Sequence, residues 1–232
     1  LLINNYLKYS AFVFCVLSYI STCVAQSCGV SISTSSINIE CPDDSVQLIA
    51  VGVTPPPVVI FSDNFDGGVQ SAPWAIFTNS DFSNPCQTSL NGTVYCWTSN
   101  NLGTNPHRIY ETPALDVQAG GEICLDFVMG NGIGGLACDL PETSDDSISL
   151  QYLDVSSVWQ NILVFNPTTA NYNTWAQFCV PIPANAHTTA TKFRLYQHNI
   201  NTAVGYGLDT WGFDNFEISA NVPVWYDWAH IP

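Results

Sequence analysis

The chain has 232 residues and is strongly acidic, with 19 Asp and Glu against four Lys and Arg and a formal net charge of −15. Nucleic-acid binding requires basic side chains that neutralise phosphates, so this charge balance excludes it and also disfavours anionic membrane surfaces. Acidity of this kind keeps an exported protein soluble, and clustered carboxylates can in addition bind Ca²⁺.

Residues 1–26 are predicted to be a signal peptide. Lys8 precedes an apolar run over residues 11–20, which is shorter than the roughly 20 residues that a membrane-spanning helix needs. Cys23-Val24-Ala25 then provides a small-x-small cleavage site, although a lipidated Cys23 is an alternative. No later run approaches membrane-spanning length, so we expect a secreted, extracellular cell-surface protein without a membrane span.

Residues 27–54 are predicted to form a short β segment. Apolar and polar residues alternate over 30–33, 37–39 and 45–50, with a turn signal at 42–44. Two or three strands cannot enclose a core alone. The segment is therefore either a partial immunoglobulin-like unit or an arm that packs on the next domain.

A run of three prolines at 55–57 predicts a stiff linker, followed by a main domain over 58–220. This domain shows repeated period-two alternation and no helical pattern, so the predicted fold class is all-β, an antiparallel jelly-roll β-sandwich preceded by the immunoglobulin-like segment. Residues 221–232 resume a strand-like pattern and are predicted to begin a following, truncated module. The main predicted strands cover 58–61, 122–128, 147–152, 177–182, 192–196 and 212–218.

The cysteines indicate disulfides rather than zinc. Seven of the nine follow the signal peptide, and they show neither CxxC pairs nor histidines at metal-ligand spacing. An odd number leaves at least one thiol free or paired outside this chain. Short separations favour Cys28–Cys41 and Cys86–Cys96, while Cys124, Cys138 and Cys179 compete for one further bridge.

The order of several short motifs within 58–220 resembles the reelin-type subrepeat, a jelly-roll sandwich related to MAM domains. The similarity is greatest to versions in large secreted surface proteins of gliding bacteria that use type IX secretion. It implies a non-catalytic module that serves in display, spacing or adhesion. The motifs that carry the resemblance are 60–66, 114–117, 123–127, 138–146, 148–152, 178–183, 191–197 and 208–216.

The resemblance also implies a structural Ca²⁺ ion that bridges the opening and closing strands of the sandwich. Such an ion needs several oxygen ligands at about 2.3–2.6 Å, which separated strands supply only after folding. Solvated turn carboxylates are the alternative explanation for these acids. The candidate ligands are Asp66, Asp209 and Asp214 at the matching positions, and Glu142, Asp145 and Asp146 in an acidic loop.

Five tryptophans of the main domain are possible sugar-stacking residues, because flat rings can pack on sugars. Trp159 and Trp211 lie within strand-like motifs and are expected in the core. Trp97 and Trp175 lie in less regular stretches and are the candidate carbohydrate-binding residues, with core packing as the alternative. Trp74 is the fifth of these tryptophans.

No catalytic residue is predicted. His107-Arg108 lies near Glu111, but no hydrolase, metalloprotease or phosphate-loop motif accompanies it, and a structural role is favoured for Arg108. The predicted function is that of a structural or adhesive module of a larger secreted protein, stabilised by calcium. Its expected partners are other modules of the same chain and surface glycans or proteins. A carbohydrate-binding module attached to an exported hydrolase is the alternative, and an enzyme ranks last.

Overall fold

The computed structural model describes residues 30–34, 48–52, 55–98, 108–133, 138–197 and 209–223. Several predictions lie outside these residues: the signal peptide over 1–26, Cys28, Cys41, His107 and most of the tail over 221–232. No helix in the described part is long and apolar enough to cross a membrane.

The chain divides into two compact units, which are described separately. The first comprises residues 1–56 and 224–232, and its described part is an antiparallel pair of strands. These strands are β1 (Val30–Thr34) and β2 (Leu48–Gly52). Whether this unit is immunoglobulin-like stays a prediction.

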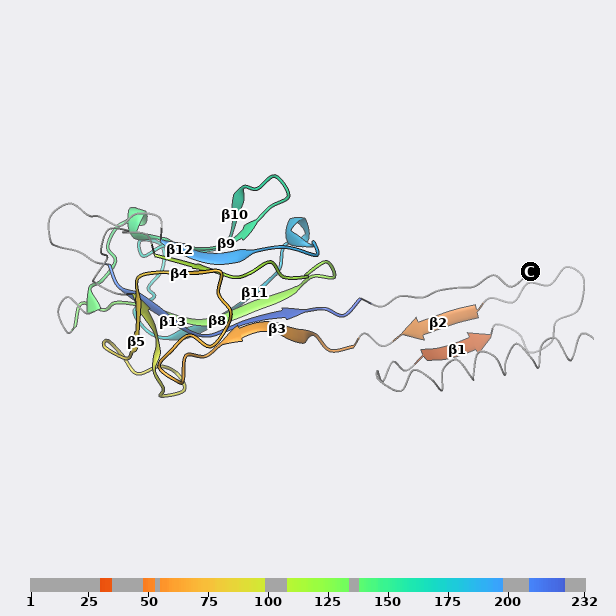
Figure 1. Ribbon diagram of the computed structural model, residues 1–232, viewed down its shortest axis with the longest axis horizontal. Coiled ribbons are helices and arrows are strands. Elements are labelled where there is room, and N and C mark those ends of the chain that lie inside the picture. Colours follow the sequence, from red (N-terminus) through yellow and green to blue (C-terminus); the bar gives the residue numbers. More distant parts are fainter. Residues whose placement is uncertain are drawn as a thin grey trace, which may run out of the picture. The chain divides into compact units, whose positions relative to one another are not determined.

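The second unit, Pro57–Pro223, is a sandwich of two antiparallel sheets, which Figure 1 shows face to face. The predicted all-β antiparallel sandwich is confirmed, and its described helices are two 3-10 turns, Ser144–Asp146 and Ala184–Ala186. The five-stranded sheet has the order β10 (Trp159–Phe165), β9 (Ile148–Leu153), β12 (Phe193–Gln197), β7 (Ile109–Glu111), β4 (Ile76–Phe77). The six-stranded sheet has the order β11 (Ala176–Pro181), β8 (Gly121–Met129), β13 (Trp211–Ala220), β6 (Tyr95–Thr98), β5 (Ser80–Ser83), with β3 (Val58–Asp63) also paired to β13.

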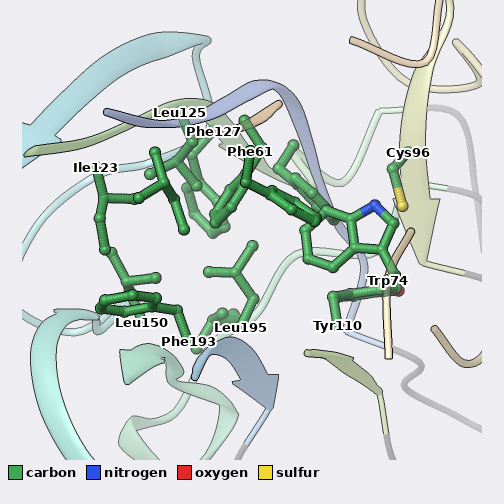
Figure 2. Packing of buried hydrophobic residues seen from close by; sticks show 14 of the residues in the cluster. Phe61, Trp74, Cys96, Tyr110, Ile123, Leu125, Phe127, Leu150, Phe193 and Leu195 are labelled. Atoms are coloured by element: carbon green, nitrogen blue, oxygen red, sulfur yellow. The ribbon is translucent and has the colours of Figure 1, made fainter. Parts of the chain in front are cut away.

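The core lies between the two sheets and follows from the period-two alternation of the strands. Residues that face inward are fully buried, because successive side chains of a strand point to opposite faces. In Figure 2 residues of β8 face residues of β9 and β12 across the interior. These facing residues are Ile123, Leu125 and Phe127 on β8, and Leu150, Phe193 and Leu195 opposite them.

Strand β13 is the centre of the six-stranded sheet. It pairs with β8 along one edge, while on its other edge it pairs first with β6 and then with β3. The pairing with β6 includes Phe213 and the pairing with β3 begins at Phe216. Asp214 and Asn215 lie between these two partners. The pairing with β8 is bulged here, and Asn215 has a φ of 47°, a conformation that Asn tolerates better than most residues.

Two disulfides connect distant parts of the sandwich. Cys124 and Cys179 lie opposite each other on β8 and β11, so they form the bridge for which three cysteines competed. Cys86 pairs with Cys138, and Cys96 is free and buried. The predicted Cys86–Cys96 bridge is therefore wrong. Cys96 points into the core from β6, whereas Cys86 lies in a loop on the outer face of the same sheet.

We predict that Cys96 is alkylated only after unfolding. Burial raises the pKa of its thiol well above the ordinary value, so the thiolate that reacts is scarce in the folded protein. Differential alkylation of the full chain, followed by peptide mapping, should find Cys96 protected in native protein and modified in denaturant. The same maps should contain linked Cys86–Cys138 and Cys124–Cys179 peptides. A linked Cys86–Cys96 peptide would contradict this assignment.

Candidate functional site

The outer face of the six-stranded sheet carries two buried carboxylates. Leu125 and Phe127 of β8 enter the core, so Asp126 between them points outward. On β13 Phe213 enters the core and Asp214 points outward, and the register places Asp214 directly beside Asp126. Both carboxylates are nevertheless buried, with exposed fractions of 3% and 0%.

The bulge residue of β13 binds both carboxylates. The main-chain N–H of Asn215 donates to Oδ1 of Asp214 at 2.9 Å, and its side-chain Nδ2 donates to Oδ2 of Asp126 at 2.8 Å. The other oxygen of each carboxylate, Oδ1 of Asp126 and Oδ2 of Asp214, has no hydrogen-bond partner among the described residues. Buried carboxylate oxygens without a partner are costly, so each calls for a proton or a cation.

Two loops bring further oxygen-bearing side chains to this pair. Asp66 follows β3, and its charge raises the pKa of Asp214. Asn91 lies in the loop after β5, and its side chain is hydrogen-bonded to Asp214. The Oδ1 of Asn91 also accepts hydrogen bonds from the hydroxyls of Ser89 and Thr93, which fixes the loop. We define Asp66, Asn91, Asp126 and Asp214 as the acidic cluster.

Burial is the main cause of the unusual titration of Asp214. The pKa of this carboxyl is raised to about 7, mainly by burial and in smaller part by the negative charges of Asp66 and Asp126. The hydrogen bonds from Asn215 and Asn91 act in the opposite direction. In the absence of a cation, a proton on Asp214 therefore competes with ionisation near neutral pH.

The oxygen donors and the unpartnered atoms of the acidic cluster fit a hard cation such as Ca²⁺, which binds carboxylate and amide oxygens. Among the described residues, one group of three His, Cys, Asp or Glu side chains has its ligand atoms within 4.8 Å of one another, and this group is Glu122, Cys124 and Cys179. The three carboxylates of the acidic cluster are therefore further apart than this. The two sulfurs of that group form a disulfide, so it is no metal site. An ion at the acidic cluster would therefore need main-chain oxygens or water beside the carboxylates, because Oδ1 of Asn91 already accepts hydrogen bonds from Ser89 and Thr93.

The structure separates the ligands that the sequence grouped together. It brings Asp66 and Asp214 into one cluster but places Asp209 beside Asp146. Glu142 and Asp145 are exposed and belong to neither carboxylate pair. Asp126 was missed, although an acid at the middle of an otherwise apolar strand was a signal that could have been followed.

Asp146 and Asp209 form a second buried pair, with exposed fractions of 6% and 9%. Their carboxyls share a hydrogen bond, and the hydroxyl and N–H of Thr143 each donate to Oδ2 of Asp146 at 2.8 Å. The fully buried Arg108 donates to the main-chain oxygen of Asp209 and to Gln197. Burial lowers the pKa of Arg108 to about 10, and its structural role stays a prediction with which these contacts agree.

We predict that Asp209→Asn flattens the pH dependence of stability. Burial first, and the neighbouring Asp146 second, raise the pKa of Asp209 to about 7 in the folded state. The folded protein therefore holds an extra proton between about pH 4 and about pH 7, and the free energy of unfolding falls as the pH rises through this window. Each pKa unit corresponds to about 1.4 kcal/mol.

Urea unfolding in chelator across this pH window measures the effect. Wild type should lose stability toward neutral pH by ~1 kcal/mol or more, and Asp209→Asn should lose less. The exposed Asp145→Asn is the matched control and should keep the wild-type slope. Equal slopes for wild type and Asp209→Asn would disprove the assignment.

The two tryptophans predicted to bind carbohydrate are buried. Trp97 and Trp175 are 3% and 7% exposed and pack with Tyr95 on the outer face of the six-stranded sheet. Gly212 of β13 permits this, because a Cβ there would lie 2.6 Å from the ring of Trp97. Cys86 packs against the same cluster. The premise that these rings are exposed is therefore wrong.

Trp159 is more exposed than the sequence predicted. It was expected in the core, but it begins the edge strand β10 on the outer face of the five-stranded sheet and is only partly buried. Its ring contacts Arg194. Trp211 is fully buried in the core, as expected.

The model of reelin subrepeat B matches residues 81–219, which is more than half of the chain. The chain belongs to the reelin subrepeat B family. The predicted reelin-type resemblance is thus confirmed, whereas the relation to MAM domains and to gliding bacteria stays a prediction. Reelin subrepeats are typically non-catalytic domains, and together with the two disulfides this membership points to an extracellular protein.

Several solved structures are similar in fold. A xylan-binding CBM22-1 domain of Paenibacillus barcinonensis Xyn10C is 10% identical, covers 72% of this chain and 97% of its own, and has a TM-score of 0.47. The K2 cleaved adhesin domain of Lys-gingipain is 12% identical, with coverages of 68% and 96% and a TM-score of 0.43. The CBM22-1–GH10 modules of Clostridium thermocellum Xyn10B are 12% identical, with 74% of this chain matching 30% of that one and a TM-score of 0.44. A comparison with curated proteins found none that matches.

Proposed function

We propose that this reelin subrepeat is a non-catalytic structural and adhesive module of a larger secreted cell-surface protein, stabilised by a calcium ion at the acidic cluster. The family, the two disulfides and the acidic composition all support an extracellular module. Partners would be other modules of the same chain and surface glycans or proteins, in adhesion or gliding. The signal peptide predicted over 1–26 would direct export.

The observation that carries the calcium part of the proposal is the pair of buried carboxylate oxygens that lack a partner, on Asp126 and Asp214. A divalent cation would satisfy both oxygens and cancel the repulsion between the two carboxylates. The ion would connect three segments that are distant in sequence, namely the loop after β3 and strands β8 and β13. An ion that binds only the folded state stabilises it by mass action.

The carbohydrate-binding alternative cannot use Trp97 and Trp175 in their described positions, because both rings are buried. No catalytic residue is proposed. The module would therefore act through its rigidity and its surface.

We predict that calcium raises the melting temperature at neutral pH and that chelator lowers it. Saturation at 100 times the dissociation constant adds about 2.7 kcal/mol. For a domain of this size, that corresponds to a shift of roughly 5–10 °C. Differential scanning calorimetry of the full chain, with calcium and with excess EDTA, measures the shift. The effect should weaken as the pH falls below about 7, because a proton then competes with the ion for Asp214, whose pKa is raised to about 7.

Variants identify the ligands. Asp126→Asn and Asp214→Asn should each abolish most of the calcium-dependent shift, and Asp66→Asn should reduce it. Asp145→Asn is the control, since this exposed acid lies outside the acidic cluster, and it should retain the full shift. A melting temperature that chelator leaves unchanged, or a shift that survives in Asp214→Asn, would refute the site.

A further inference from the structure

The outer face of the five-stranded sheet carries a strip of polar and aromatic side chains. Phe193 and Leu195 of β12 enter the core, so Arg194 and Tyr196 lie on the opposite face. The antiparallel register places Gln151 of β9 on one side of Arg194 and Glu111 of β7 on the other. Trp159 and the exposed Asn161 of β10 complete the strip at the sheet edge.

Arg194 is held in one orientation at the centre of this strip. Its Nε donates to Oε1 of Gln151 at 2.8 Å, and Nε2 of Gln151 donates to Oδ1 of Asn161 at 2.7 Å. The guanidinium carbon lies 3.9 Å from the ring centroid of Trp159 and 4.6 Å from that of Tyr196. Two aromatic rings and an amide therefore fix the planar group before any ligand arrives.

This guanidinium has no carboxylate partner in the part of the chain that the structure describes. The one ion pair found there joins Lys192 to Glu111 at 2.9 Å, and the charge of Glu111 acts on Arg194 without a direct ion pair. The terminal nitrogens of Arg194 form no hydrogen bond with any described residue. Arg108 is fully buried and cannot serve a ligand. In a chain with 19 acids and four bases, a partly buried Arg194 without a directly bonded carboxylate is an exception.

We infer that this strip binds a carboxylate-bearing saccharide, with Arg194 holding the carboxylate and the flanking rings contacting the sugar. The guanidinium fork matches a carboxylate in two parallel hydrogen bonds. Trp159 and Tyr196 offer partly exposed aromatic surface beside it, and Asn161 offers an amide for hydroxyl groups. The net charge of −15 repels polyanions of high charge density, so a short uronate segment fits better than a sulfated or phosphorylated polymer.

This inference rests on the adhesive part of the proposed function and is independent of the calcium part. The strip lies on the five-stranded sheet, whereas the carboxylates of the acidic cluster lie on or beside the six-stranded sheet. Asp214→Asn should therefore leave saccharide binding unchanged. Loss of the calcium effect and loss of saccharide binding can be observed separately.

Isothermal titration of the full chain with trigalacturonic acid tests the inference. The fully methyl-esterified trisaccharide is the matched ligand, because it keeps the sugar rings and removes the charges. We expect the acid to bind at least about ten times more tightly than the ester, the size of effect given by a charge-assisted hydrogen-bond pair. Equal affinity for the two ligands, or no binding of the acid, would overturn the inference.

Variants of the protein test whether Arg194 itself binds the carboxylate. Arg194→Gln should weaken binding about ten-fold or more, and Arg194→Lys, which keeps the charge but loses the fork, should be intermediate. Gln177→Ala, an exposed substitution on β11 of the other sheet, is the control and should leave the affinity unchanged. Unchanged binding in Arg194→Gln would contradict the assignment. Equal binding of a triglutamate peptide would show a general carboxylate site and would also overturn it.

Discussion

The change of partner along β13 is the constraint on which the rest of the sandwich depends. One edge of this strand pairs with β8, while the other edge passes from β6 to β3. Between these partners Asp214 and Asn215 have no strand neighbour on that side. The loop after β3 and the loop that carries Asn91 approach β13 there. The same strand thus supplies core aromatics on one face and a buried acid on the other.

The sandwich contains more buried acid than its few bases can neutralise. One pair, Asp146 and Asp209, lies close to the buried Arg108 and shares a hydrogen bond. The other, Asp126 and Asp214, has no ion pair with a base among the described residues, and two of its oxygens have no hydrogen-bond partner there. The repulsion within each carboxylate pair can be relieved by a proton or by a cation, and the pH and the cation concentration around the protein determine which of the two binds. The proposed calcium ion is the cation in this choice.

The outer faces of the two sheets differ in what covers them. On the six-stranded sheet, Trp97 and Trp175 form a small second core with Tyr95, and Cys86 of the disulfide packs against it. On the five-stranded sheet, Arg194 lies between two partly exposed rings. A covered face stabilises the module, whereas a partly exposed face with an unpaired cation can recognise a partner.

The sequence predicted the sandwich, because alternation of apolar and polar residues reports directly on which strand face is buried. It also placed Asp66 and Asp214 at the two ends of the domain. An acid within an apolar strand marks Asp126 as unusual, but the sequence could not pair it with Asp214, because period-two alternation says which face an acid occupies and not which strand lies beside it. Nor could it predict that Trp97 is covered and Trp159 is not.

What the sequence determined by itself is local: strand positions, the acidic charge, the family motifs and a cysteine pattern that indicates disulfides. Only the tertiary structure decided which residues meet. The two carboxylates of the acidic cluster that lie on strands are 88 residues apart, and the disulfides close separations of 52 and 55 residues. Sheet order and loop packing set these contacts, and both arise from the burial of the whole core rather than from any short stretch of chain.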